Sequence, residues 1–356
     1  MSKPFNPEQK QESLMQKANL DWQQLPFGYI KTDCHLEYYY RNGKWDEGTV
    51  VEEDTVTLNI AATCLHYGQE CFEGVKVFED PQGRALIFRV ERNAERMANS
   101  ARKLLMQPFP EDKFINAIFK LVRLNQRFIP PHGSGASLYI RPLLLGISSL
   151  IGVKPATEYL FLVFCTPVGP YFKHGLKPIK LLVEESIDRA APNGVGDVKV
   201  GGNYAAGLRA SVNAHHLGYD EVLYLDANHK KYIDESGPAN FFGISKENKY
   251  LTPDSKSILP SITNKSLMAL AEEMGLGVEK RPIHIEEIFD LAEAGCCGTG
   301  AIISPVKSIT YRDQTVNYSE NEEIGPISKK LYDKLTSIQM GVIEDKYGWT
   351  REIPLD

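Results

Sequence analysis

The apolar run from Tyr159 to Val168 constrains the fold more than any other stretch of this sequence. Its ten residues are too few to cross a bilayer as a helix, which takes about 20 residues. A run of this length with almost no polar positions predicts a strand that is buried on both faces of a sheet. Residues 169–175, which follow it, carry glycine and proline and predict a break between domains.

Two domains are also what the length of 356 residues favours, at about 100–200 residues per domain. We expect a small N-terminal α/β domain at residues 1–170, a linker at 171–178 and a larger domain at 179–356. In the first half, the patterns predict strands at 56–60, 74–78, 84–89 and 137–145 and helices at 91–106 and about 114–128. In the second half, they predict strands at 179–184, 221–226, 232–234 and 241–245 and helices at 205–217, 264–275, 285–293 and 327–340. This mixture predicts an α/β or mixed α+β enzyme.

The composition limits the classes of partner. Charged residues make up 24% of the chain, the net charge is -6, and no block of Lys and Arg stands out, so we expect no nucleic-acid partner. The six cysteines show no regular spacing, and the adjacent Cys296 and Cys297 cannot form the C-x-x-C pair of a metal or redox site. We therefore expect reduced thiols and no metal. Because the N-terminus shows no apolar leader, we also expect no membrane contact and a cytoplasmic location.

Glycines crowd one lysine within residues 194–204, where Tyr204 follows Lys199 by five positions. Small neighbours allow a flat ring to approach the lysine amine closely. A lysine that loses its solvation there becomes neutral more readily, and a neutral amine can attack a carbonyl carbon and later move a proton. Taken alone, the segment favours the simpler interpretation, a surface turn with an ordinary charged lysine.

Three further segments of the second half suggest sites for a phosphorylated ring. Glu235 ends a predicted strand, where a carboxylate could keep a pyridine nitrogen protonated, although a solvated loop acid is the commoner case. Ser261 and Thr263 open a predicted helix whose free N–H groups could bind an anion, and simple helix capping explains them as well. The turn at 298–300 offers a hydroxyl and backbone amides suited to phosphate or carboxylate, or it is an ordinary turn.

Together these segments resemble the branched-chain amino-acid aminotransferases, which are class IV pyridoxal-phosphate enzymes. Further phrases occur in the order of that family, and the resemblance runs from about residue 27 to 341: HYGQECFEG at 66–74, FR at 88–89, SLYIRP at 137–142 and PVGPYF at 167–172. The resemblance implies the two-domain fold type IV architecture shared with D-amino-acid aminotransferase, with the cofactor held by the domain at 179–356. It also implies a homodimer that transfers amino groups between L-leucine, L-isoleucine or L-valine and 2-oxoglutarate.

The same resemblance assigns roles around pyridoxal 5'-phosphate. Lys199 would be the Schiff-base lysine, Tyr204 would hydrogen-bond the phenolic oxygen of the cofactor, and Glu235 would pair with its ring nitrogen. The cofactor phosphate would be bound by Arg89, Ile262, Thr263 and Thr299. The turn formed by Thr299, Gly300 and Ala301 would receive the substrate α-carboxylate.

The resemblance also implies a substrate side-chain pocket, lined by Phe27, Tyr67, Phe72, Tyr139 and Tyr171. Such an aromatic lining favours Leu, Ile and Val by apolar burial. Arg141, together with Tyr67 and Tyr139, would bind the side-chain carboxylate of glutamate through charge-assisted hydrogen bonds. Phe27, Phe72 and Tyr171 fit equally well as residues of the hydrophobic core.

A few positions depart from the family pattern. Ala301 and Ser304 stand where animal relatives carry a C-x-x-C pair, so no thiol switch of that kind is expected. Pro238 replaces a threonine near the cofactor ring, and Asn264 replaces an arginine. The alternatives are another class IV activity, D-amino-acid transamination or the aminodeoxychorismate lyase reaction, and a catalytically silent cofactor-binding or scaffold protein. Tyr67, Tyr139 and Arg141 weigh against the first, and the complete cofactor set weighs against the second.

Overall fold

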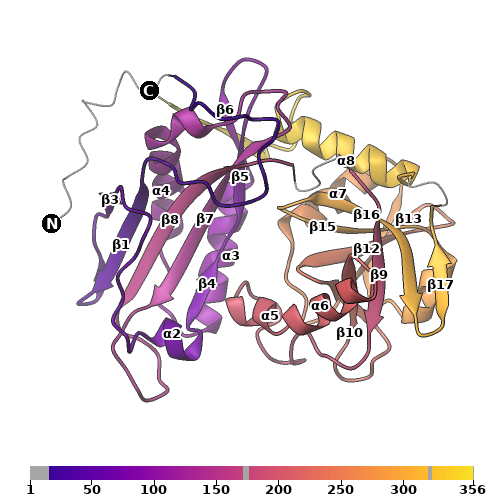
Figure 1. Ribbon diagram of the computed structural model, residues 1–356. Coiled ribbons are helices and arrows are strands. Elements are labelled where there is room, and N and C mark those ends of the chain that lie inside the picture. Colours follow the sequence, from indigo (N-terminus) through magenta and orange to yellow (C-terminus); the bar gives the residue numbers. More distant parts are fainter. Residues whose placement is uncertain (1–15, 171–175, 320–322, 356) are drawn as a thin grey trace. The chain divides into compact units, whose positions relative to one another are not determined.

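The computed structural model describes residues 16–170, 176–319 and 323–355, and it divides into two compact units (Figure 1). The first unit comprises residues 1–173 and 337–356, and the second comprises 174–336. The sequence-based division placed 337–356 with the second domain. The tail belongs to the first unit because β18 (Thr350–Ile353) pairs antiparallel with β6 (Ala85–Phe88). Of the expected linker, residues 171–175 lie outside the described residues.

The first unit is built on an antiparallel sheet in the order β18-β6-β5-β7-β8-β1-β2, with β3 paired to β1 and β4 paired to β7. The apolar run is β8, which lies between β7 and β1 with nine of its ten residues buried, as its sequence predicts. The other strands are β1 (His35–Arg41), β2 (Lys44–Trp45), β3 (Thr49–Val51), β4 (Glu70–Phe72), β5 (Val75–Glu79) and β7 (Ser137–Gly146).

Two amphipathic helices, α3 (Val90–Lys103) and α4 (Glu111–Leu124), pack on one face of this sheet (Figure 1). Phe161 of β8 stacks on Phe109 at 3.9 Å between ring centroids and also contacts Phe114 of α4. The short helix α2 (Thr63–Tyr67) precedes β4. The strand expected at 56–60 does not form, because this segment is largely exposed and its backbone pairs with no strand among the described residues.

The second unit contains a closed barrel. Its strands follow the order β11-β10-β9-β16-β15-β12, and an additional pairing between β11 and β12 completes the ring. Apolar side chains such as those of Leu223, Phe241 and Ile309 fill the core. The barrel strands are β9 (Ile179–Glu184), β10 (Glu221–Leu225), β11 (Ile233–Ser236), β12 (Ala239–Ser245), β15 (Leu291–Gly298) and β16 (Ile302–Tyr311), and they are extended by β13 (Lys249–Pro253), β14 (Gly277–Arg281) and β17 (Gln314–Asn317).

Helices lie around the barrel (Figure 1): α5 (Gly201–Ala205), α6 (Leu208–His216), α7 (Ile262–Glu273) and α8 (Pro326–Gln339). The prediction of a helix at 285–293 was wrong. The segment forms the short 3-10 helix η3 (Ile285–Asp290), and β15 begins at the next residue. The carboxylate of Glu293 in β15 instead caps α8, because it accepts the N–H groups of Ile327 and Ser328 at 2.8 Å. Within the described part of the chain, no helix has the length and apolar character needed to cross a membrane.

Candidate active site

Lys199 lies in the loop that leads from β9 to α5, and its neighbours fix its position. Its Nζ donates a hydrogen bond to the hydroxyl of Tyr204 at 2.7 Å. Asn203 donates from its Nδ2 to the carbonyl oxygens of Val195 at 2.7 Å and Val198 at 2.9 Å, which ties the loop to the first turn of α5. The glycine-rich segment therefore presents an amine beside a phenol rather than a free surface lysine.

Glu235 of β11 is only 4% exposed, and each of its oxygens has a partner. Oε1 accepts the backbone N–H of Leu259 at 2.7 Å and the Nδ2 of Asn240 at 3.2 Å. Oε2 pairs with the guanidinium of Arg189 at 3.2 Å. Burial raises the pKa of Glu235 to about 7, although the charges of Arg189 and Lys199 act in the opposite direction. Lys199 and Glu235 thus share one electrostatic environment.

Arg189 is a site residue that sequence reasoning missed. It is buried, and its Nη2 donates to the carbonyl oxygen of Ser257 while its Nη1 pairs with Glu235. Gly196 allows this packing, because a Cβ there would come within 2.3 Å of the Ser257 carbonyl oxygen. A single sequence does not reveal a buried arginine of this kind. Its role depends on an ion pair with a residue far away in the sequence and not on the residues next to it in the chain.

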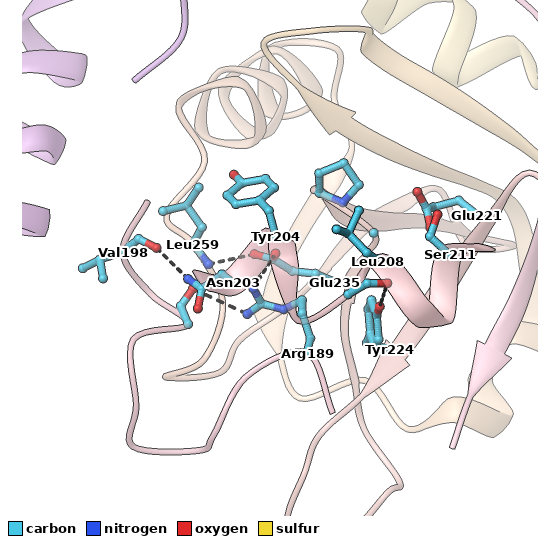
Figure 2. A pocket seen from close by; sticks show the side chains of 14 residues that line it. Arg189, Val198, Asn203, Tyr204, Leu208, Ser211, Glu221, Tyr224, Glu235 and Leu259 are labelled. Carbon is cyan, nitrogen blue, oxygen red and sulfur yellow. Dashed lines mark hydrogen bonds and ion pairs between the residues drawn. The ribbon is translucent and has the colours of Figure 1, made fainter. Parts of the chain in front are cut away.

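A pocket of about 180 Å³ opens beside this cluster, lined by residues of α6, β10 and β11 and of the loop that carries Lys199 (Figure 2). Tyr204 and Glu235, two of the predicted residues, line it together with Arg189 and Pro238. Val198, the neighbour of Lys199, also reaches it. Figure 2 shows the guanidinium of Arg189 and the backbone N–H of Leu259 directed at the carboxylate of Glu235. The pocket therefore combines an aromatic side with a single buried acid.

Two further predicted segments of the second unit have geometry suited to anions. Ser261 is the N-cap of α7 and accepts the N–H of Asn264 at 3.1 Å, which leaves Ile262 and Thr263 in the first turn. Asn264, in place of the family arginine, is buried and bonds Tyr250 and Thr252 through its side chain. The segment therefore combines the expected cap with the N–H groups of a helix start.

Thr299, Gly300 and Ala301 form the short connection between β15 and β16. The next residue, Ile302, has a φ of +68°, a conformation that is strained for a β-branched side chain. Strain of this kind is found most often where function requires a fixed backbone. The predicted carboxylate-binding turn is thus held in a geometry that its sequence alone does not favour.

Arg89 belongs to the first unit, where it is the N-cap of α3 with a φ of +49°. Its backbone N–H bonds the carbonyl oxygen of Trp349 at 2.6 Å, and its guanidinium lies 5.0 Å from the centroid of the Trp349 ring. Burial lowers the pKa of this guanidinium. Residues at the C-terminus therefore fix the predicted phosphate ligand.

The first unit also brings together four of the residues that were predicted to bind the substrate side chain. The rings of Phe27 and Tyr139 meet edge to face at 5.7 Å, and Arg141 donates to the Tyr139 hydroxyl at 3.1 Å. The guanidinium of Arg141 lies 4.9 Å from the centroid of Phe72, and its buried Nε has no hydrogen-bond partner among the described residues. Tyr67 lies in α2, where its hydroxyl donates to the carbonyl of Ile151. Tyr171 lies outside the described residues.

The amino-transferase class IV family pattern matches residues 70–309. The chain belongs to this family. Its sequence is 48% identical to the branched-chain-amino-acid aminotransferase of Helicobacter pylori, over 94% of this chain and 98% of that protein. It is 45% identical to the protein of the same name from Haemophilus influenzae, over 93% and 98% of the two chains.

Solved structures of class IV aminotransferases show the same fold. The branched-chain amino acid aminotransferase of Escherichia coli superimposes with a TM-score of 0.73 at 27% identity, covering 89% of this chain and 99% of that one. A second branched-chain amino acid aminotransferase, from T.th. and solved with pyridoxamine 5'-phosphate, gives a TM-score of 0.76 at 25% identity, over 92% and 100% of the two chains. The architecture is therefore fold type IV, with a mixture of helices and sheets, as the resemblance implies.

Proposed function

We propose that this class IV aminotransferase exchanges amino groups between L-leucine, L-isoleucine or L-valine and 2-oxoglutarate, with pyridoxal 5'-phosphate as its cofactor. The observation that carries the proposal is the amine of Lys199, held by Tyr204 beside the buried acid Glu235. The branched-chain names of its relatives, which match nearly the whole chain, support the substrate class.

The residues present fit this cofactor. Glu235 is buried, which raises its pKa, and its carboxylate would accept a hydrogen bond from the protonated ring nitrogen of a pyridine and so keep that nitrogen protonated. Tyr204 accepts a hydrogen bond from Lys199, and we assign it also to the phenolic oxygen of the cofactor. We assign the phosphate to Arg89, to the backbone N–H groups of Ile262 and Thr263 and to the Thr299 hydroxyl. When bound, the cofactor supplies an aldehyde for the substrate amine and a ring that draws electrons from the substrate α-carbon.

The chain's own groups perform the proton transfers. Once the substrate is bound, the Nζ of Lys199 acts as a general base and removes the proton from the substrate α-carbon. Later it returns a proton as a general acid. Tyr204 orients that amine through its 2.7 Å hydrogen bond. Arg189, Asn240 and the N–H of Leu259 fix the carboxylate of Glu235. The turn at Thr299, Gly300 and Ala301 is our assignment for the α-carboxylate of the substrate.

The substrate side chain is assigned to the first unit. Phe27, Phe72 and Tyr139 offer an apolar surface for leucine, isoleucine or valine. Arg141, whose buried Nε lacks a partner among the described residues, supplies a donor for the side-chain carboxylate of glutamate. We assign Tyr67 and Tyr171 to the same subsite on the resemblance. D-amino-acid transamination and the lyase reaction are not favoured, because the relatives that match nearly the whole chain carry branched-chain names.

The decisive test replaces the reacting amine. The wild-type protein, saturated with pyridoxal 5'-phosphate, should convert L-leucine and 2-oxoglutarate into 4-methyl-2-oxopentanoate and glutamate, with parallel lines in initial-rate plots. Lys199→Ala should lose at least about 10³-fold in kcat, because both proton transfers lose their catalyst. Lys177→Ala, an exposed lysine at the start of the second unit, is the control. Activity with D-alanine but not L-leucine, or an active Lys199→Ala protein, would contradict the proposal.

We also propose that the protein is a homodimer that works in the cytoplasm. Ile60, Leu65, Ile151 and Val153 in the first unit are between 60% and 87% exposed. The two segments that carry them lie side by side, because the N–H of Leu150 bonds the carbonyl of Ala61 and the hydroxyl of Tyr67 bonds that of Ile151. Apolar side chains exposed together favour contact with another protein surface. None of the six cysteines, all of which lie within the described residues, forms a disulfide, which supports a reducing compartment.

A further inference from the structure

Trp349, which lies just before β18, contacts Arg89 through both its backbone and its side chain. Its carbonyl oxygen accepts the backbone N–H of Arg89 at 2.6 Å. Its ring centroid lies 5.0 Å from the guanidinium carbon of Arg89. The resemblance in sequence ends at about residue 341 and the family pattern at residue 309, so neither assigns a role to Trp349. The arginine that we assign to the cofactor phosphate thus rests on a residue from outside the recognised part of the chain.

Arg89 depends on its surroundings for its conformation. Its φ of +49° lies in the left-handed region, which residues other than glycine rarely adopt. Such a backbone persists only where neighbouring groups fix it, and the hydrogen bond to Trp349 does so. A free arginine side chain also loses many rotamers when it binds an anion. A ring that holds the guanidinium beforehand reduces this cost, because a guanidinium can rest its face on a ring while its edge donates hydrogen bonds.

Trp349 is itself held by other aromatic rings and by a turn. Its ring stacks on that of Tyr347, with 4.1 Å between the centroids, and meets the ring of Phe88 edge to face at 5.8 Å. The carboxylate of Asp345 accepts the N–H of Tyr347 at 3.1 Å and that of Thr350 at 2.6 Å, which closes the turn. Thr350 then pairs with Phe88, the last residue of β6. The tryptophan ring is therefore a fixed surface.

The simpler interpretation is that Trp349 only anchors the C-terminal segment, and two observations count against it. Trp349 remains partly exposed, whereas Ile353 of β18 is only 1% exposed and anchors this strand. The strand is also held by Arg351, which pairs with Glu91 at 3.2 Å and lies 4.9 Å from the ring centroid of Phe119. The segment thus has anchors of its own, while the tryptophan ring contacts the guanidinium.

We propose that Trp349 is a positioning residue of the cofactor site, which holds Arg89 in the conformation that binds the phosphate. The C-terminal segment is then part of that site, although it lies outside the stretch that resembles the family. This inference rests on the proposed role of Arg89 and deepens it. Because Trp349 acts only through Arg89, its loss should weaken a ligand that carries a phosphate and spare the same ligand without it.

Binding of two forms of the coenzyme tests this role without turnover. The full chain is stripped of cofactor, and absorbance titration gives the Kd of pyridoxal 5'-phosphate and of pyridoxal, which carries the same aldehyde but no phosphate. Trp349→Leu should weaken pyridoxal 5'-phosphate at least about fivefold and change pyridoxal by less than about twofold. Trp349→Phe keeps a ring and should stay within about twofold of wild type for both ligands. Phe119→Leu is the matched control, because it removes a ring from beside another arginine of the same unit, and it should change neither Kd.

A double-mutant cycle shows whether Trp349 acts through Arg89. When Arg89→Ala is already present, adding Trp349→Leu should change the Kd of pyridoxal 5'-phosphate by less than about twofold, because the group that Trp349 positions is gone. Trp349→Met, whose flexible side chain fills space well, should reproduce the selectivity if the leucine variant folds poorly.

Equal weakening of both ligands in these Trp349 variants would show that the residue only supports the fold. Unchanged affinity for pyridoxal 5'-phosphate, or a full additional loss on top of Arg89→Ala, would show that Trp349 does not act through Arg89. Each of these results overturns the inference. A wild-type protein that shows the expected affinities but does not convert L-leucine would contradict the proposed function alone.

Discussion

At the scale of single residues, Glu235 depends on its surroundings for its charge. Burial raises its pKa to about 7, while Arg189 and Lys199 act against that rise. In the protein without cofactor, the acid is therefore partly protonated near neutral pH. A pyridine nitrogen that shares a proton with this carboxyl would add a favourable partner for the charged form.

The raised pKa of Glu235 predicts a pH-dependent stability of the cofactor-free protein. Because the folded state holds the proton more tightly than the unfolded chain, this stabilisation is complete below about pH 4.5 and is lost as the pH rises through about 7. The shift from 4.5 to about 7 corresponds to roughly 3 kcal/mol. The unfolding free energy of wild type, measured in urea, should therefore decrease from pH 5 to pH 8 relative to that of Glu235→Gln.

Glu185→Gln, which changes a half-exposed acid of the same unit that pairs with Arg312, is the control and should follow wild type. Parallel stability curves for wild type and Glu235→Gln would show that burial does not perturb this carboxyl. Added pyridoxal 5'-phosphate should reduce the difference between the two proteins at pH 8, because the bound ring gives the charged carboxylate of the wild type a partner.

Some of these residues could be predicted from sequence and others could not. Lys199, Tyr204 and Glu235 stand in short motifs whose order along the chain identifies the family. Arg189 stands in no such motif. Arg189 is defined by its contact with Glu235, which is 46 positions away. Such pairings depend on strand order and on loop packing, which one sequence does not reveal.

At the scale of elements, the junction of β4 and β5 requires a glycine. The carboxylate of Glu73 is held by Arg96 at 2.7 Å and by Asn93 at 2.8 Å, so the backbone here is fixed. A Cβ at the next residue, Gly74, would come within 2.1 Å of the Tyr139 hydroxyl. The hydrogen bond between Arg141 and Tyr139 therefore depends on the absence of a side chain at Gly74.

Gly74→Ala should damage substrate binding more than folding. The added methyl group would displace the Tyr139 hydroxyl, which can move because it ends a side chain, and KM for L-leucine should rise by about tenfold or more. The unfolding free energy should change by only about 1 kcal/mol. Gly277→Ala is the matched control, because its nearest contact is an ordinary 3.4 Å from Lys249. Unchanged kinetics in Gly74→Ala would mean that Tyr139 does not touch the substrate.

The elements themselves were predictable where pattern and burial agree. The strands at 159–168 and 179–184 form at the predicted bounds, because continuous or alternating burial leaves a clear trace in their sequences. The helix expected at 285–293 failed, since Ile285, Ile288 and Leu291 have helical spacing but belong to η3 and the start of β15. The strand expected at 56–60 failed because its alternation finds no neighbouring strand among the described residues. Local patterns do not record which backbone partners are available.

At the scale of the whole molecule, each unit carries its own set of candidate residues. Lys199, Tyr204 and Glu235 belong to the second unit, whereas Arg89 and Arg141 belong to the first. The chain length and the glycine and proline residues near residue 170 predicted two domains. They did not predict that the C-terminal tail returns to the first domain, because β18 is a short strand whose partner β6 precedes it by more than 250 positions.

The exposed apolar surface predicts how the protein assembles. Replacing Ile151 and Val153 together with glutamate should convert a dimer into a monomer, because buried charges would oppose the contact. Light scattering coupled to size-exclusion chromatography measures the mass, and the monomer should also lose activity. Leu217→Glu changes an apolar residue of the second unit that is 68% exposed and should leave the mass unchanged. A wild-type protein that is monomeric at micromolar concentration would refute the proposal.

The pairing of β18 with β6 has a consequence for synthesis of the chain. The ribosome makes residues 350–353 long after residues 85–88, so β6 keeps an open hydrogen-bonding edge while the whole second unit is being translated. The same late segment supplies Trp349, on which the guanidinium of Arg89 rests. The barrel can close while the N-terminal sheet is still waiting for its final strand, and a nascent chain that terminates early would expose an unpaired edge prone to aggregation.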